Sequence, residues 1–265
     1  MKRISVGNAD LNIETSGSGE EWLVLLHEIG GTLESWSAVA PALSKRFHAL
    51  RYDQRGAGHS DRIKGEFSLE TQIDDLRALL DALSVRGPCH LAGGAIGSAL
   101  AVRFNARFPK AVRTLVLACP AMNVSADRIE YLNARAAKVE AEGMGAVVES
   151  SLANSYPPNV IRDEKAYAAY RARFLANDPA SYAAINRAFS KFDAMPDLAA
   201  IKCPTLVLAG AHDKLRPPDA VREVVERIPG ARHAVIDSGH IMPVQAPQAM
   251  IAAMNAFYDE VALRG

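Results

Sequence analysis

Two polar residues in the C-terminal part of the chain have the types and the order needed for proton transfer. Asp213 follows the apolar run 204–209, and His240 follows the last strand-like stretch, 232–236. An aspartate in this place can accept the Nδ1 proton of a histidine, and the histidine can then move protons to and from a reacting group. Either residue alone is compatible with an ordinary loop position. Both together, in this order, predict an acid–histidine pair.

A third segment, residues 89–99, has the spacing that raises a reactive side chain above a sheet. A short apolar strand runs into Gly93-Gly94-Ala95-Ile96-Gly97 and then into an alanine-rich helix. In the pattern Gly-x-Ser-x-Gly, such a tight strand-to-helix turn presents a serine nucleophile. Here the nucleophile position holds Ala95, which has no hydroxyl, thiol or carboxylate.

Backbone N–H groups beside this turn are expected to stabilise the negative oxygen that forms on a reacting carbonyl. One belongs to Ile96, directly after the nucleophile position, and the other to Ile29, in the loop after the apolar run 22–26. Gly30 and Gly31 allow that loop to turn close to a substrate, and a plain glycine turn is the alternative interpretation.

Two interpretations of Ala95 remain open. An introduced Ser→Ala change would let the protein bind substrate without turnover, and the intact acid, histidine and glycines favour it. A natural protein without the nucleophile is favoured by the unusual Gly94. Ser98 and Cys119 are weaker candidates for a substitute nucleophile, because Ser98 lies past the turn and a thiol needs a neighbouring base. Loss of the nucleophile lowers turnover of a serine protease by about 10⁶-fold, so we expect negligible esterase turnover, restored by Ala95→Ser.

The elements that would position these residues alternate between strands and helices. Residues 2–6 and 11–16 predict a hairpin, and apolar runs predict strands at 22–26, 47–52, 114–118, 204–209 and 232–236 and before Gly93. Helical spacing predicts helices over 35–45, 69–83 and 218–227 and at the C-terminus. This alternation is typical of a doubly wound, mainly parallel sheet, whose ligands bind at the carboxyl ends of the strands.

Residues 122–196 interrupt this alternation, because they contain several helical stretches and no convincing strand. We predict that they form a helical cap, inserted into a core made of residues 1–121 and 197–265. Such a cap would lie over the carboxyl ends of the strands and set the specificity of the pocket.

Candidate pocket residues come from this cap and from the loops around the turn. Tyr131 and Arg135 are predicted to face a ligand, and Trp36 is predicted on the pocket wall. Arg128 and Arg162 are further arginines that could receive a substrate carboxylate. Most aromatic residues of the cap are nevertheless expected to pack, and most of its arginines to be solvated.

Composition excludes several classes of partner. Thirty basic and thirty acidic residues give a formal net charge of zero without a basic run, which argues against nucleic acid or an anionic membrane. The spacing of three cysteines fits neither disulfides nor a zinc site, so we expect buried thiols in a reducing compartment. No signal peptide or membrane-spanning run is evident. We expect a cytoplasmic monomer or homodimer that acts on a small molecule.

Together these motifs resemble the α/β-hydrolase superfamily over essentially the whole chain, and within it the 3-oxoadipate enol-lactonase group most. The resemblance is carried by residues 27–31 with Trp36, and by 51–60, 75–83, 93–97, 210–213 and 239–240. It implies an α/β-hydrolase fold, with a mainly parallel eight-stranded sheet flanked by helices and a helical cap. It further implies a small carboxylated lactone, ester or amide from aromatic breakdown as substrate, with no cofactor and no metal.

The chain departs from the pattern of that family in two further places. Glu28 stands where many relatives carry glycine or a small polar residue. It is interpreted as a catalytic carboxylate beside the oxyanion site or, as we favour, as an outward-facing or salt-bridged side chain. His59 and Ala57 exchange the usual places of a histidine and a variable residue, and we expect His59 to be structural.

The sequence therefore predicts hydrolysis of a small carboxylic ester or enol-lactone by a Ser-His-Asp type mechanism, with this chain disabled at the nucleophile. Two alternatives remain open. One is a cofactor-free lyase or C–C hydrolase that uses His240 and Asp213 alone, and the other is a non-catalytic ligand-binding protein on the same scaffold.

Overall fold

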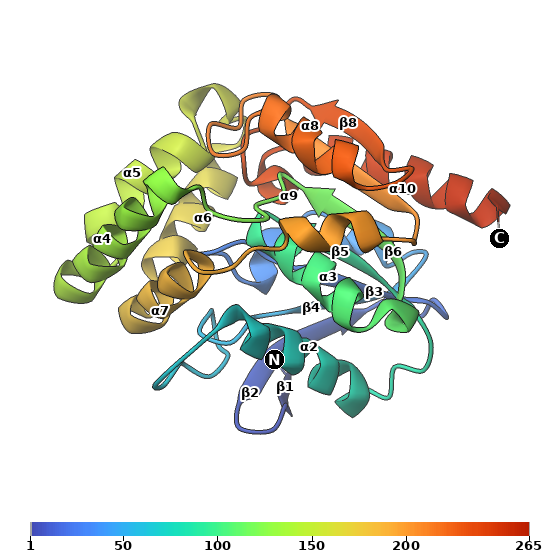
Figure 1. Cartoon of the computed structure of the whole chain (residues 1–265), viewed down its shortest axis with the longest axis horizontal. Coiled ribbons are helices and arrows are strands. Elements are labelled where there is room, and N and C mark those ends of the chain that lie inside the picture. The colour runs from blue at the N-terminus through green and yellow to red at the C-terminus, as the bar shows by residue number, and fades with distance from the viewer. Residues whose placement is uncertain (1, 265) are drawn as a thin grey trace.

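The centre of the molecule is an eight-stranded sheet with the strand order β1-β2-β4-β3-β5-β6-β7-β8 (Figure 1). The computed structural model describes residues 2–264. β1 pairs with β2, and β2 with β4, in antiparallel fashion, and the remaining pairs are parallel. The predicted α/β fold with a mainly parallel sheet is confirmed. The strands are β1 (Lys2–Ser5), β2 (Asp10–Ser16), β3 (Trp22–Leu26), β4 (His48–Tyr52), β5 (Cys89–Gly94), β6 (Val112–Ala118), β7 (Thr205–Gly210) and β8 (Arg232–Ile236).

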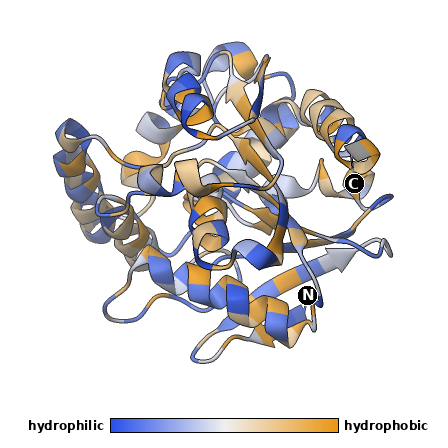
Figure 2. Cartoon of the chain, turned by 45° about the vertical axis from the view of Figure 1, so that its right-hand side comes forward, coloured by the Kyte–Doolittle hydropathy of each residue, from blue (hydrophilic) through white to orange (hydrophobic). Residues whose placement is uncertain are grey.

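Helices cover both faces of this sheet, which explains why its central strands are continuous apolar runs. One face packs against α2 (Leu69–Ala82), α3 (Ile96–Arg107) and α8 (Pro218–Arg227). The other face packs against α1 (Ala40–Leu43), α9 (Met242–Gln245) and α10 (Pro247–Arg264). The hydrophobic colour of the central strands is visible in Figure 2. In the described part of the chain, no helix combines the length and the apolar character needed to cross a membrane.

Between β6 and β7 the chain forms α-helices and, within the described residues, no strand. These helices are α4 (Ala126–Glu142), α5 (Gly145–Ser155), α6 (Glu164–Leu175) and α7 (Pro179–Phe189). We call them the helical segment; it lies to one side of the sheet in Figure 1 and has an apolar cluster of its own. The strand-free helical region is as predicted. Its division from the core at residues 122 and 196 stays a prediction.

The prediction of one helix over residues 35–45 is wrong. The chain instead forms a 3₁₀ turn, η1 (Leu33–Trp36), followed by the short helix α1. Pro41 stands in the first turn of α1. Because proline has no backbone N–H, it cannot continue a helix that started before it, and it is tolerated at a helix start instead.

Candidate active site

The turn between β5 and α3 has the strained geometry that the sequence predicts there. Ala95 alone separates the two elements, with a φ of 51° and a ψ of −113°. A positive φ is uncommon for a residue with a Cβ. The flanking glycines permit the turn: a Cβ on Gly93 would lie 2.2 Å from the carbonyl carbon of Gly97, and one on Gly97 would lie 2.4 Å from the carbonyl oxygen of Leu26. No larger residue fits at either position without moving the backbone.

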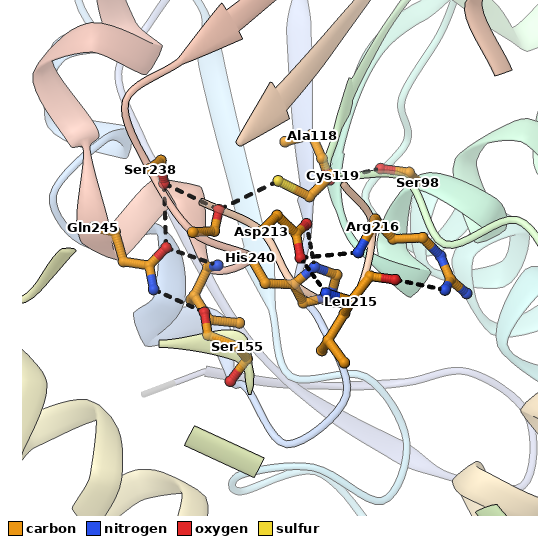
Figure 3. Close-up of polar contacts among 12 residues, drawn as sticks. Ser98, Ala118, Cys119, Ser155, Asp213, Leu215, Arg216, Ser238, His240 and Gln245 are labelled. Atoms are coloured by element: carbon orange, nitrogen blue, oxygen red, sulfur yellow. Dashed lines mark hydrogen bonds and ion pairs between the residues drawn. The ribbon is translucent and has the colours of Figure 1, made fainter. Parts of the chain in front are cut away.

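Asp213 and His240 form a buried hydrogen-bonded pair (Figure 3). Nδ1 of His240 and Oδ2 of Asp213 are 2.7 Å apart, and the amides of Leu215 and Arg216 donate to the other carboxyl oxygen at 2.8 and 2.9 Å. Burial by itself would raise the pKa of Asp213, but His240 and the two amides outweigh it and hold the pKa below its ordinary value. The ionised carboxylate can therefore orient the imidazole and leave Nε2 for proton transfer.

The loop that carries His240 is fastened to the helical segment. The amide of His240 donates to the carbonyl oxygen of Ser155, at the end of α5, over 3.0 Å. Nε2 of Gln245, on α9, donates to the same oxygen over 2.9 Å, and its Oε1 accepts from the amide of Ile241 at 3.1 Å (Figure 3). These bonds join segments that are far apart in the sequence, so the position of His240 depends on the helical segment.

One pocket collects the residues around Ala95. Glu28 and Ile29 come from the loop after β3, Ile96 begins α3, and His240 follows β8. The cavity has a volume of about 150 Å³. A cavity of roughly that size holds a benzene-sized ligand. The helical segment contributes, among others, Arg128, Tyr131, Arg135, Ser151, Tyr170, Phe174 and Tyr182.

Two residues predicted for the pocket lie elsewhere. Trp36 is fully buried in the apolar cluster on the sheet face that α1 and α10 cover, because η1 turns it inward. Gly30 connects its loop to the helical segment instead: its carbonyl oxygen accepts a hydrogen bond from Nδ2 of Asn177 at 2.9 Å. A Cβ at Gly30 would lie 2.6 Å from the ring of Phe174.

Glu28 turns inward, so the favoured prediction of an outward-facing or salt-bridged side chain is wrong. Its side chain lines the pocket and is 4% exposed. The hydroxyl of Ser35 donates to Oε1 at 2.7 Å. None of the ion pairs formed within residues 2–264 includes Glu28. The sequence could not indicate this, because a charged residue lies at the surface unless tertiary partners hold it inside.

The substitute nucleophiles considered from the sequence are not available for attack. Ser98 is fully buried, and its hydroxyl donates to the carbonyl oxygen of Gly93 at 2.8 Å. Cys119 is also fully buried, although its sulfur lies within 4.8 Å of ligand atoms of Asp213 and His240. Burial raises the pKa of the Cys119 thiol well above its ordinary value, so the sulfur stays protonated.

The arginines of the helical segment have different surroundings. Arg135 lines the pocket and donates to the hydroxyls of Tyr182 and Ser151, and in the described chain it forms no ion pair. Arg128 also lines the pocket, with its guanidinium over the ring of Tyr131. Arg162 pairs with Asp237 away from the pocket.

Two further predictions concern residues outside the pocket. His59 is exposed, and its amide donates to Oδ2 of Asp53 at 2.8 Å. Cys89 and Cys119 are buried as expected, whereas Cys203 is only half-buried.

Comparisons with known proteins agree with this architecture. Residues 21–247 match a family model described as alpha/beta hydrolase fold. A protein of Azorhizobium caulinodans with the name "Putative carbamate hydrolase RutD" is 30% identical over 259 residues, which cover 96% of this chain and 97% of that protein. The 3-oxoadipate enol-lactonase 2 of Acinetobacter baylyi is 27% identical over 93% of this chain and 92% of its own length. The solved structure of the enol-lactonase from Burkholderia xenovorans LB400 is 29% identical, with a TM-score of 0.92 over 97% of this chain and 100% of that one.

Proposed function

We propose, from the premise that this chain belongs to the α/β-hydrolase family, that its pocket binds a small carboxylic ester, enol-lactone or carbamate with the reacting carbonyl above Ala95. The names of the similar proteins support these compound classes. The observation that carries the proposal is that Ala95, Ile29, Ile96 and His240 all line one pocket.

In this proposal each of these residues has a separate role. The amides of Ile29 and Ile96 donate to the carbonyl oxygen; Ile96 is the first residue of α3, so its N–H has no partner within the helix. His240, held by Asp213, transfers protons to and from the leaving group. The methyl group of Ala95 occupies the place of a nucleophile.

The position of Arg135 favours a ligand that carries a carboxylate. Its guanidinium reaches the pocket with hydroxyl partners and, among the described residues, no acidic partner. An arginine can hold a carboxylate with two parallel hydrogen bonds. We therefore expect the carboxylate of the ligand to point toward α4, and its reacting carbonyl toward the sheet.

A second candidate function needs no nucleophile, and a specific observation favours it. Three of the residues that depart from the family pattern lie together: Gly94 precedes Ala95 in the chain, and Oε2 of Glu28 lies 3.9 Å from where a Cβ of Gly94 would be. An isolated Ser→Ala change would not account for this grouping. It supports a natural pocket in which His240 and Asp213 transfer protons without an acyl-enzyme.

The test of the proposed function is the pre-steady-state release of p-nitrophenol from p-nitrophenyl acetate. A burst equal to the enzyme concentration marks an acyl-enzyme. We expect no burst from the chain with Ala95, a burst from Ala95→Ser, and the loss of that burst in Ala95→Ser combined with His240→Ala. A burst from the chain with Ala95, or none from Ala95→Ser, would contradict the proposal.

A further inference from the structure

Glu28 is a buried carboxyl group in the pocket that has, among residues 2–264, no cationic partner. Oε1 accepts from Ser35, and Tyr170, on α6, lines the same pocket close enough to interact with the side chain of Glu28. Burial, followed by the charge of Glu28, raises the pKa of Tyr170 well above its ordinary value, so this hydroxyl stays a proton donor. A carboxyl group kept out of water without an opposite charge is costly, and such groups are found where chemistry needs them.

The order of the strands places Glu28 and His240 on opposite sides of Ala95. β5, which leads to Ala95, has β3 as one neighbour and β6, β7 and β8 on its other side. Glu28 follows β3 and His240 follows β8. A carbonyl group held above Ala95 therefore has a carboxyl group on one side and an imidazole on the other.

The carboxylate of Glu28 beside Ala95 is unfavourable for a serine mechanism and favourable for a mechanism in which it accepts a proton. In a serine mechanism the oxyanion at the amides of Ile29 and Ile96 would form beside the negative charge of Glu28, and two like charges would share one pocket. If Glu28 itself accepts the proton as the oxyanion forms, the negative charge moves from one group to the other and is not doubled.

We propose that Glu28 is a catalytic general base that activates a water molecule for direct addition to the carbonyl carbon, with His240 as the general acid. This inference rests on the proposed function, because it needs the acyl group above Ala95. The inference goes beyond the proposed function because it assigns a proton acceptor for the attacking water, which a turn without a nucleophile requires.

The water oxygen bonds to the carbonyl carbon, its proton passes to Glu28, and the electron pair of the C=O bond moves to the oxygen at the two amides. The electron pair then returns, the bond to the leaving group breaks, and the imidazolium of His240 gives the leaving group its proton. Glu28 returns a proton to His240 through solvent, so one water and one ester, lactone or carbamate are consumed without an oxidant or a cofactor.

This mechanism predicts slow, measurable hydrolysis by the chain with Ala95, in place of the negligible esterase turnover expected from the sequence. The experiment measures hydrolysis of p-nitrophenyl acetate and of dihydrocoumarin by the full chain and by Glu28→Gln. Since general base catalysis contributes about 10²–10⁴-fold, kcat should fall at least about 100-fold while KM stays within about twofold. Glu34→Gln is the matched control, because Glu34 is an exposed carboxyl of the same loop region and does not line the pocket. Formate should partly restore the activity of Glu28→Gly, which a purely structural role would not allow. Absence of hydrolysis by the chain with Ala95, or a kcat of Glu28→Gln within about threefold of that chain's, would overturn the inference.

A second arm separates this inference from the proposed function. The acylation burst of Ala95→Ser should become about tenfold faster or more when Glu28→Gln is added, because the like charge beside the oxyanion is removed. Equal burst rates would overturn the inference and leave the proposed function standing. If neither variant is acylated, the proposed function fails and the inference fails with it.

Discussion

At the scale of single residues, the conformation of Ala95 does not come from its own side chain. A sparsely populated backbone conformation of this kind costs on the order of 1–3 kcal/mol and persists only where the surroundings enforce it. The surroundings here are Gly93 and Gly97, whose missing side chains let β3, β5 and α3 approach one another. The turn was therefore predictable from the spacing of glycines, although a methyl group stands at its tip.

Asp213 gives the first prediction at this scale. Its pKa is lowered on folding, so the stabilisation from its ionised form is present above the unfolded-state pKa and is lost as the pH falls through the folded-state value. Asp213→Asn should lower the free energy of unfolding at pH 7 by about 1–3 kcal/mol. The difference in stability from the unsubstituted chain should shrink below about pH 4.

Urea unfolding of both proteins at pH 7 and at pH 3 provides the measurement. An equal difference at the two pH values would show that the charge of Asp213 does not contribute. Asp237→Asn is the control, because Asp237 is an exposed carboxylate and its pairs with Arg162 and His212 lie at the surface.

Glu28 and Trp36 show where prediction from single residues stops. Charged side chains are usually outside, so an outward Glu28 was the sound expectation. Tyr170, which interacts with it in the pocket, belongs to α6 and is distant in the sequence. Trp36 was expected on the pocket wall, but η1 directs it into the sheet face that α1 and α10 cover. Neither tertiary contact leaves a local signal in the sequence.

At the scale of elements, strands were predicted better than short helices. β3 and β7 are continuous apolar runs because each strand is buried on both faces of the sheet. Such runs can be recognised from the sequence alone. The region 35–45 also has an apolar pattern, but Pro41 divides it, and the structure contains a turn and one short helix. The backbone hydrogen bond that Pro41 cannot donate decides the structure of this region more than the periodicity of its apolar side chains does.

Gly97→Ala is the prediction at the element scale. A Cβ at residue 97 would lie 2.4 Å from the carbonyl oxygen of Leu26, so β3 and α3 would have to separate. We expect the free energy of unfolding to fall by at least about 1–3 kcal/mol, as for other overpacked sites. Gly94→Ala is the matched control, since the nearest atom to a Cβ there is 3.9 Å away. Equal stabilities of the two variants in urea unfolding would contradict this account of the turn.

At the scale of the whole molecule, the pocket is formed where three strand ends and the helical segment come together. Glu28, Ala95 and His240 follow β3, β5 and β8, and the carbonyl of Ser155 holds the last of these loops under α5. The alternation of strands and helices predicts that these strand ends lie at one edge of the sheet, and the strand-free stretch predicts that helices cover this edge. Packing between the helices of the helical segment decides which of its residues line the pocket. The sequence therefore indicated Tyr131 and Arg135 but not Ser151 or Tyr170.

The most direct measurement is a crystal structure of the chain with Ala95 soaked with 5-oxotetrahydrofuran-2-carboxylate, a small lactone that bears a carboxylate. We expect the pocket to hold either the intact lactone or its hydrolysis product, in which the ester C–O bond of the ring is broken. Neither should be covalently attached to the protein. Its carbonyl oxygen should lie about 3 Å from the amides of Ile29 and Ile96, with its carboxylate toward Arg135. A ligand attached to Ser98 or Cys119, or one whose carbonyl lies away from both amides, would contradict the account.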